Sequence, residues 1–161
     1  MQRRDLFKSV TSKLQPTKVK AATLLRPPYN SDEALFELCL ECSGSCATAC
    51  DEQIIIIGAD KTPFLNLLES GCTFCDDCAT ACEPNVLTLE AKHNINAKIT
   101  IDKGLCLSWN EVMCFSCKDP CLDDAIIFKS LFKPIIDGDK CTACGFCISR
   151  CPSEAIKVEV L

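Results

Sequence analysis

The side chains best able to do chemistry in this 161-residue sequence are its 16 cysteines, which fall into four groups of four. In the last group, Cys141 to Pro152 reads C-T-A-C-G-F-C-I-S-R-C-P. A run of this spacing supplies three thiolates to one [4Fe–4S] cluster and a fourth thiolate to a neighbouring cluster. Because no cysteine is left over, we predict four [4Fe–4S] clusters with all 16 cysteines as ligands: Cys39, Cys42, Cys46, Cys50, Cys72, Cys75, Cys78, Cys82, Cys106, Cys114, Cys117, Cys121, Cys141, Cys144, Cys147 and Cys151.

The spacing is not uniform, which keeps zinc as an alternative for two of the groups. The first group has an extra residue before Cys46, and the third has a seven-residue gap between Cys106 and Cys114. Structural zinc sites take two C-x₂-C pairs from separate loops. A third cysteine at the same short spacing therefore favours a cluster in the second and fourth groups. Disulfides are disfavoured, because cysteines two residues apart are poorly placed to bridge a fold.

Crossed ligation is expected between neighbouring groups, because the fourth cysteine of such a run serves the other cluster. The gaps between groups are similar in length, so spacing alone does not decide which groups pair. The strand pattern favours the first with the second and the third with the fourth. The predicted sites are the first (Cys39, Cys42, Cys46, Cys82), the second (Cys50, Cys72, Cys75, Cys78), the third (Cys106, Cys114, Cys117, Cys151) and the fourth (Cys121, Cys141, Cys144, Cys147).

Short elements must position these cysteines. Ser31 is predicted to cap a helix that carries Leu35, Phe36 and Leu38 inward and leads to Cys39. Runs rich in β-branched residues next to the cysteine groups predict strands. These runs are 54–58, 86–90, 98–102, 125–128, 134–137 and 155–160.

The order of strand, cysteine loop, helical turn and strand occurs twice, and this repeat predicts the fold class. We expect an α+β fold of two tandem ferredoxin-like modules, each holding two [4Fe–4S] clusters. The modules are predicted at residues 31–93 and 94–161, after a flexible basic arm and Pro-rich linker at 1–30. Apart from its cysteines the chain has an ordinary number of apolar residues and few aromatic ones. We therefore expect bound clusters to supply part of the folding free energy.

Charge is distributed unevenly along the chain. Residues 1–26 carry a net charge of +6, and the remainder carries −11. An acidic body disfavours nucleic-acid binding, which needs a basic face. Arg3 and Arg4 look like the start of an export signal, but the polar residues 11–20 that follow are not an apolar h-region. No stretch approaches the ~20 apolar residues of a membrane span, so we expect a cytoplasmic protein without one.

Enzyme chemistry has no support in the motifs. There is no phosphate-binding G-x-x-x-x-G-K-[ST] loop, no G-x-G-x-x-G and no credible pair of nucleophile and base. His93, the sole histidine, is expected to be an exposed bystander, and Trp109 to shield a cluster from water. The acidic pairs Asp76–Asp77 and Asp123–Asp124 are expected to be solvated surface. One-electron transfer, rather than catalysis, is the chemistry that remains.

Two segments are more distinctive than the cysteine runs. Residues 26–36 read R-P-P-Y-N-S-D-E-A-L-F, and residues 106–121 read C-L-S-W-N-E-V-M-C-F-S-C-K-D-P-C. With the Arg-Arg arm and the final C-P run, they resemble the NapF family of ferredoxin-type accessory proteins of periplasmic nitrate reductase. The resemblance covers nearly the whole chain. It departs at the extra residue before Cys46.

The resemblance implies a specific partner and place of action. Members of this family are expected to bind the precursor of the molybdenum-containing catalytic subunit in the cytoplasm, before its export. They are thought to help that subunit acquire or reduce its own cluster. Two other functions stay open, those of a general soluble carrier serving other redox proteins and of an electron-transfer subunit in a larger oxidoreductase. A +6 arm on an acidic body favours docking to a particular partner.

Overall fold

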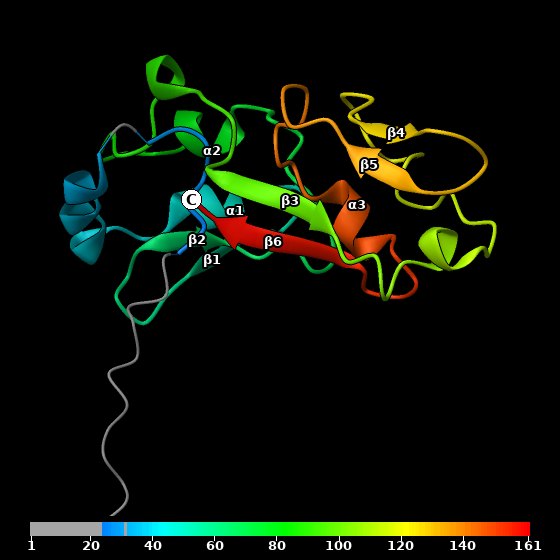
Figure 1. The fold of residues 1–161 in the computed structure, drawn as a ribbon. Helices are drawn as coiled ribbons and strands as arrows, with labels where there is room; N and C mark the ends of the chain where they lie inside the picture. Colours follow the sequence, from blue (N-terminus) through cyan, green and yellow to red (C-terminus); the bar gives the residue numbers. More distant parts are fainter. Residues whose placement is uncertain (1–23, 31) are drawn as a thin grey trace, which may run out of the picture.

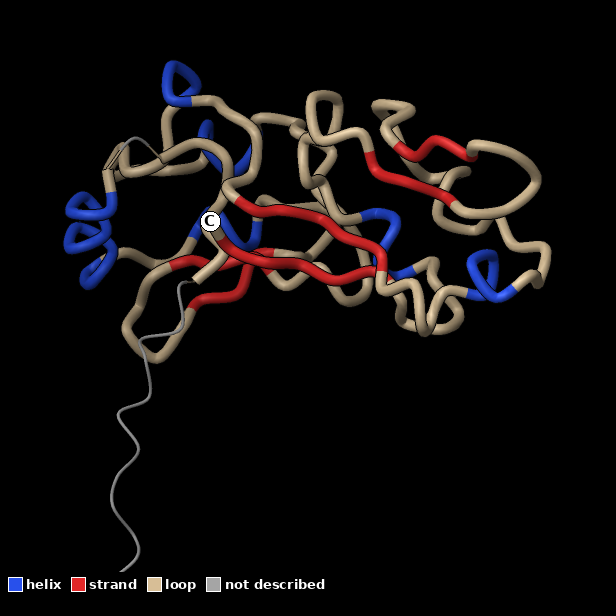
Figure 2. Tube along the Cα trace, viewed as in Figure 1, coloured by secondary structure: helices blue, strands red, loops and turns tan. Residues whose placement is uncertain are grey.

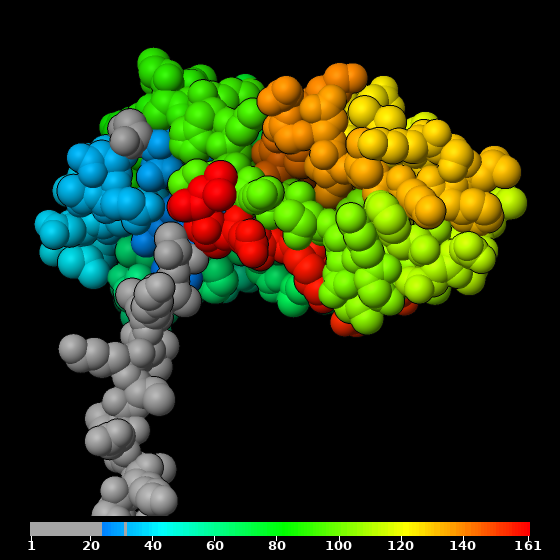
Figure 3. Space-filling view, viewed as in Figure 1, coloured from blue at the N-terminus to red at the C-terminus, as the bar shows by residue number. Residues whose placement is uncertain are grey.

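The computed structural model describes residues 24–30 and 32–161, and Figures 1 and 2 show short helices and strands joined by long loops. The basic arm with Arg3 and Arg4, and the cap predicted at Ser31, lie outside the described residues. We call residues 24–93 the first half and 94–161 the second half. The two halves lie beside each other in the space-filling view, which gives the described chain an elongated shape (Figure 3).

The regular elements are all short. This mixture of short helices and short antiparallel strands confirms the predicted α+β class. None of the helices in the described part of the chain is long and apolar enough to cross a membrane. The helices are η1 (Glu33–Glu41), α1 (Ser45–Thr48), α2 (Asp77–Thr80), η2 (Leu89–Ala91), η3 (Leu107–Asn110) and α3 (Phe146–Ser149), where η marks a 3₁₀ helix. The strands are β1 (Ile55–Ile57), β2 (Pro63–Leu65), β3 (Ala97–Ile101), β4 (Ile126–Phe128), β5 (Pro134–Ile136) and β6 (Ile156–Val160).

The second half follows the strand prediction closely. Its first and last strands, β3 and β6, pair antiparallel from Ala97 opposite Val160 to Ile101 opposite Ile156. Between them, β4 and β5 form a hairpin, with Ile126 opposite Ile136. The strands predicted at 98–102, 125–128, 134–137 and 155–160 are therefore confirmed. Two cysteine loops connect the hairpin to the outer pair, as seen in Figure 1.

The first half has the hairpin but not the outer strand pair. The strand predicted at 54–58 is confirmed as β1, which pairs with β2. The strand predicted at 86–90 is wrong: Val86 and Leu87 are buried in irregular chain, and η2 follows them. The opposite segment explains this difference, because it contains Pro27 and Pro28, which have no N–H to donate to a ladder. The amide of Thr88 donates to the Tyr29 carbonyl oxygen, without a continuous ladder around it.

The segment expected to be a linker is anchored inside the first half. Pro27, Pro28 and Tyr29 are among the most deeply buried side chains. The Arg26 guanidinium donates to Thr62 Oγ1 and to the Pro63 carbonyl oxygen, at 2.8 Å each. It also lies 4.2 Å from the centre of the Phe36 ring. The Arg26 guanidinium therefore holds this segment against the start of β2 through fixed hydrogen bonds.

Helix η1 differs in detail from its prediction. Asp32 is its N-cap, and its side chain accepts a hydrogen bond from the Ala34 amide at 2.9 Å. A 3₁₀ helix has three residues per turn, so Phe36 and Cys39 share the buried face. Leu38, predicted to point inward, is 53% exposed.

Candidate iron–sulfur sites

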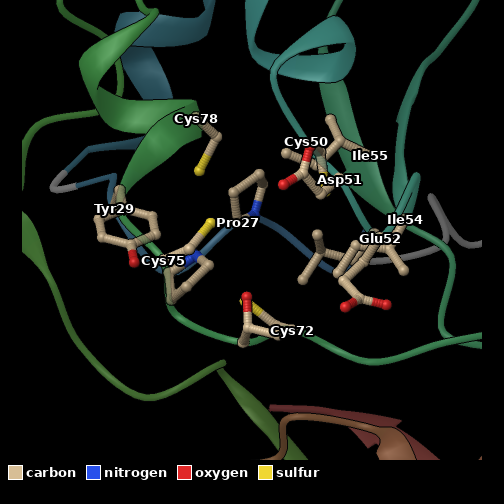
Figure 4. A pocket seen from close by; sticks show the side chains of 13 residues that line it. Pro27, Tyr29, Cys50, Asp51, Glu52, Ile54, Ile55, Cys72, Cys75 and Cys78 are labelled. Carbon is tan, nitrogen blue, oxygen red and sulfur yellow. The ribbon is translucent and has the colours of Figure 1, made fainter.

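The cysteines of the predicted second site surround one cavity of about 170 Å³. Figure 4 shows Cys72, Cys75 and Cys78 around it, with Cys50 entering from the preceding cysteine group. The remaining wall is mostly apolar and includes Tyr29 and both prolines of the anchored segment. Four cysteine sulfurs are the donor type and number that a [4Fe–4S] cluster takes.

The other predicted sites are assembled in the same crossed way. Cys39, Cys42 and Cys46 of the first site line a cavity with Cys82, which comes from the second group. The fourth site gathers Cys141, Cys144 and Cys147 with Cys121. In the third site, burial and then the neighbouring Cys106, Cys151 and Cys114 raise the pKa of Cys117 to about 11. The three sets that line a cavity each combine three cysteines of one group with the last cysteine of its neighbour. The neighbours of Cys117 follow the same pattern in the third.

Short helices position the third cysteine of three groups. Cys46, Cys78 and Cys147 are each the second residue of a four-residue helix, α1, α2 and α3, and each is buried. The residue before each helix has a left-handed backbone, with φ of +79° at Gly44 and +92° at Gly145. Such a turn reverses the chain between the second and third cysteines. In the third group, the 3₁₀ helix η3 occupies the long gap instead.

Backbone amides stabilise the last cysteine of three groups. Leu87 donates to Cys82 Sγ at 3.3 Å, and Ala155 donates to Cys151 Sγ at 3.2 Å. The Ala125 amide donates in the same way to Cys121 Sγ, at 3.3 Å. Hydrogen bonds to sulfur favour the thiolate and help to set the potential of an iron–sulfur site. The sequence carries no motif for these donors, because backbone conformation alone directs the amides.

Burial acts in the opposite direction on several of the thiols. It raises the pKa of Cys46 to about 11, and the pKa of Cys78 and of Cys147 to about 12. Burial also opposes ionisation of Cys151, but backbone hydrogen bonds from Ser153 and Ala155 outweigh it and lower the pKa of that thiol. Gathering four such sulfurs as thiolates needs positive charge among them, which iron supplies.

A buried hydroxyl without a partner lies in the long gap of the third cysteine group. Ser108 is 1% exposed, and its Oγ has no hydrogen-bond partner among the described residues. Leaving such a group unsatisfied costs about 1–3 kcal/mol. Ser108 lies two residues after Cys106, where a bound cluster would offer sulfur acceptors. The site with the most irregular spacing therefore still fits a bound group.

Trp109 fixes the same loop against the β4–β5 hairpin. Its Nε1 donates to the Pro134 carbonyl oxygen at 2.9 Å. Lys103 lies over the indole, with its Nζ 4.5 Å from the ring centre. The long gap in the third group is therefore held by named contacts, and its predicted role in shielding a cluster stays a prediction.

A network beside the second site was missed by the sequence analysis. The Tyr29 hydroxyl donates to Asp76 Oδ1 at 2.8 Å, and Lys92 pairs with the same oxygen at 2.6 Å. Burial, followed by the Asp76 carboxylate, raises the pKa of Tyr29. Asp76 lies between Cys75 and Cys78, so it anchors this cysteine loop and is not merely solvated surface. No sequence signal links residues so far apart in the chain.

A single metal ion needs a tighter group of ligands than a cluster does. In residues 24–30 and 32–161, no three Cys, His, Asp or Glu side chains are grouped as they would be around one ion. His93 is exposed, as expected, and its Nε2 lies 3.1 Å from the Asn30 carbonyl oxygen.

Known proteins with similar sequences are ferredoxin-type proteins. Residues 134–157 match the family described as 4Fe-4S binding domain. The chain is 33% identical over 147 residues to the ferredoxin-type protein NapF of Escherichia coli, which covers 88% of both chains. It is 29% identical to the methylamine utilization ferredoxin-type protein MauM of Methylobacillus flagellatus, over 98% of this chain and 75% of that one. It is 26% identical to the ferredoxin-type protein NapG of Haemophilus influenzae, over 85% and 58% respectively. All three relatives are ferredoxin-type proteins.

Proposed function

Because this chain belongs to the NapF family of ferredoxin-type proteins, we propose that it is an electron-transfer accessory protein rather than an enzyme. Its partner is the catalytic subunit of a periplasmic nitrate reductase. The two meet in the cytoplasm, before the subunit is exported. There the chain assists assembly or reduction of the subunit's own iron–sulfur cluster.

One observation supports the electron-transfer part of this proposal most directly. Twelve of the 16 cysteines line three cavities in sets of four, and each of these sets includes the last cysteine of a neighbouring group. The remaining four cysteines are proposed to form the third set. Each set is proposed to hold one [4Fe–4S] cluster, within two ferredoxin-like modules at 31–93 and 94–161. When bound, these clusters supply one-electron transfer.

The chain's own residues do the remaining work. The cysteines bind iron, and the amides of Leu87, Ala125 and Ala155 stabilise the thiolates that bridge each pair of groups. Tyr29 and the buried prolines exclude water from one side of the second site.

The order of events follows from topology. A cytoplasmic protein cannot reach a periplasmic enzyme after export, so any contact with it must come earlier. The proposed role is therefore maturation and not electron supply during nitrate turnover. The competing function is that of a general electron carrier. Loss of such a carrier would not lower the cluster content of one particular enzyme.

A deletion strain tests the proposal. Exported nitrate reductase should be present but poorly active, with a weak iron–sulfur signal in its electron paramagnetic resonance (EPR) spectrum. The full chain, or a Gly138→Ala variant changed at an open position, should restore both when expressed from a plasmid. A Cys75→Ser variant, which removes a proposed ligand of the second site, should restore them poorly.

The same strains can reject the maturation role. Enzyme purified from a normal strain should turn over without added accessory protein. If the deletion leaves cluster content and activity intact under iron limitation and aerobic stress, the maturation role is wrong. The general-carrier function would then take its place.

A further inference from the structure

The second and fourth sites meet across the boundary between the two halves. The amide of Cys72 donates to the carbonyl oxygen of Cys144, with an N···O distance of 2.7 Å. Cys72 belongs to the second site and Cys144 to the fourth. A single backbone hydrogen bond therefore joins a cysteine of one half to a cysteine of the other.

Gly71 makes this close approach possible. It is buried, and a Cβ built on it would lie 2.5 Å from the Phe146 amide nitrogen and 2.7 Å from the Cys144 carbonyl oxygen. Both of these neighbours are backbone atoms, which cannot rotate away. Glycine is therefore required at this position because the space between the two backbones has no room for a Cβ.

Further contacts hold the same junction together. A Cβ on Gly145 would lie 2.8 Å from Leu67 Cδ1, so Leu67 of the first half packs directly onto the loop between Cys144 and Cys147. Within the second half, the Ile95 amide donates to the Thr142 carbonyl oxygen at 3.2 Å. The loop of the fourth site is therefore held by contacts from both halves of the chain.

The sites are connected within each half as well. Cys50 and Cys82 are exchanged between the first and second sites, and Cys121 of the third group lines the cavity of the fourth site. The spatial order of the sites is therefore first, second, fourth and third, which is not their order in the sequence.

We infer that electrons pass between the two halves through the Cys72–Cys144 contact, which we call the crossing. Glycine at position 71 keeps the two backbones close enough for this transfer. The four sites then form one path, with the first and third sites at its ends. This inference rests on the proposed function, because it requires that the sites hold clusters.

The electron balance is simple. A low-potential one-electron donor is oxidised by one electron at an end of the path, and the site that receives the electron is reduced by one. Each crossing of the Cys72–Cys144 contact oxidises one site and reduces the other by the same electron. No bond is made or broken, and no proton is required.

The test compares Gly71→Ala with Gly138→Ala in the full anaerobic chain. Gly138 is the matched control, because a Cβ there meets nothing within 4 Å. Reduced protein should show magnetic coupling between clusters of the two halves by EPR, and pulsed one-electron reduction should show rapid equilibration across the chain. In Gly71→Ala we expect coupling within each half to persist, coupling between the halves to be lost and equilibration between them to slow severalfold. The Gly138→Ala variant should match the wild type.

Cluster content separates the possible failures. A wild-type chain without its clusters would overturn the proposed function itself. A Gly71→Ala chain with full iron and sulfide and unchanged coupling would overturn the crossing alone. If Gly71→Ala loses iron from the fourth site, Leu67→Ala opens the same junction by deleting a side chain. Reduced coupling at full iron content in that variant supports the crossing, and unchanged coupling overturns it.

Discussion

Backbone amides are the main polar partners of several half-buried cysteine sulfurs in this chain. Amides contact Cys82, Cys121 and Cys151 at 3.2–3.3 Å, and similar contacts reach Cys42 and Cys72 at 3.4 Å. Because these donors are fixed by the fold, they favour negative charge on sulfur without any titratable side chain. Hydrogen bonds to sulfur are one of the factors that set the potential of a bound iron–sulfur cluster.

Ser108 is the side chain placed to change one of these potentials. Replacing it by alanine removes the only hydroxyl that is buried without a partner in the described part of the chain. If that hydroxyl donates to sulfur in the third site, its loss should lower the reduction potential of that site while iron content stays unchanged. Anaerobic redox titration followed by EPR measures this.

Ser130→Ala is the control for this prediction. Ser130 is exposed in the turn between β4 and β5, and its Oγ accepts from the Phe132 amide at 3.5 Å. Its removal should leave every potential in place. A third-site potential that is equal in the wild type and in Ser108→Ala would show that Ser108 makes no such bond.

The cysteine sets could be predicted from sequence because ligand spacing is local and chemically constrained. Three of the sets that the crossed pattern predicts line a cavity each. Contacts such as Tyr29 with Asp76, or Gly71 with Phe146, could not be predicted. They join residues far apart in the chain through single side chains or a missing Cβ, and neither leaves a periodic pattern.

At the scale of elements, each half has a hairpin between its cysteine groups. The halves differ in how their first and last segments are joined, which we call closure. The second half closes with β3 and β6, which pair over five residues each. The first half closes with the segment from Leu24 to Tyr29, held by isolated bonds such as that from the Leu65 amide to the Leu25 carbonyl oxygen at 2.7 Å. Arg26 compensates for the missing ladder with its side-chain contacts.

An Arg26→Lys variant tests that compensation. Lysine keeps the charge but cannot donate to Thr62 Oγ1 and the Pro63 carbonyl oxygen as a planar fork, and it stacks less well on Phe36. We expect hydrogen exchange at the Leu65 and Thr88 amides to accelerate, while protection in β3 and β6 is unchanged. Mass spectrometry or NMR of the cluster-loaded chain measures this exchange.

The matched control is Arg150→Lys, an exposed site in the second half. It should leave exchange in the first half as it is in the wild type. Equal exchange in Arg26→Lys and wild type would mean that the buried prolines alone hold the segment.

The difference in closure also explains which elements could be predicted. The strands of both hairpins and of the β3–β6 pair follow β-branched runs that pair with another such run. The run at 86–90 has a similar composition, but its neighbour contains Pro27 and Pro28. Whether a strand forms depends on the partner as well as on the run itself, so composition alone was misleading there.

For the whole molecule, the apolar core is small and the sheets have only two strands each. An isolated two-stranded hairpin is at best marginally stable in water. Many buried core positions are cysteines, whose burial stabilises the fold best when they hold metal. Folding and cluster binding should therefore be one process.

Cluster removal tests this coupling. An iron chelator with an oxidant should abolish the near-ultraviolet circular dichroism and the amide protection of both halves together. The physical reason is that the iron and sulfide that would fill the space between the four sulfurs of each set, and join two cysteine groups, are lost. A cluster-free chain that keeps native-like tertiary structure would contradict the account.

The order of the sites in space is a property of the whole molecule that spacing did not reveal. Similar gaps between cysteine groups are compatible with several arrangements of the two halves. The order follows from the packing of Leu67 and Gly71 against the loop between Cys144 and Cys147.

The central claim is that all four cysteine sets hold a [4Fe–4S] cluster, and metal analysis of the anaerobically purified chain tests it most directly. Four clusters with four iron and four sulfide atoms each predict about 16 iron and about 16 sulfide per chain. Mössbauer spectra should assign all of that iron to [4Fe–4S] clusters. About 12 of each, with free thiols in the first or third site, would show that one irregularly spaced set is vacant. Stoichiometric zinc in protein isolated from its native host would contradict the claim altogether.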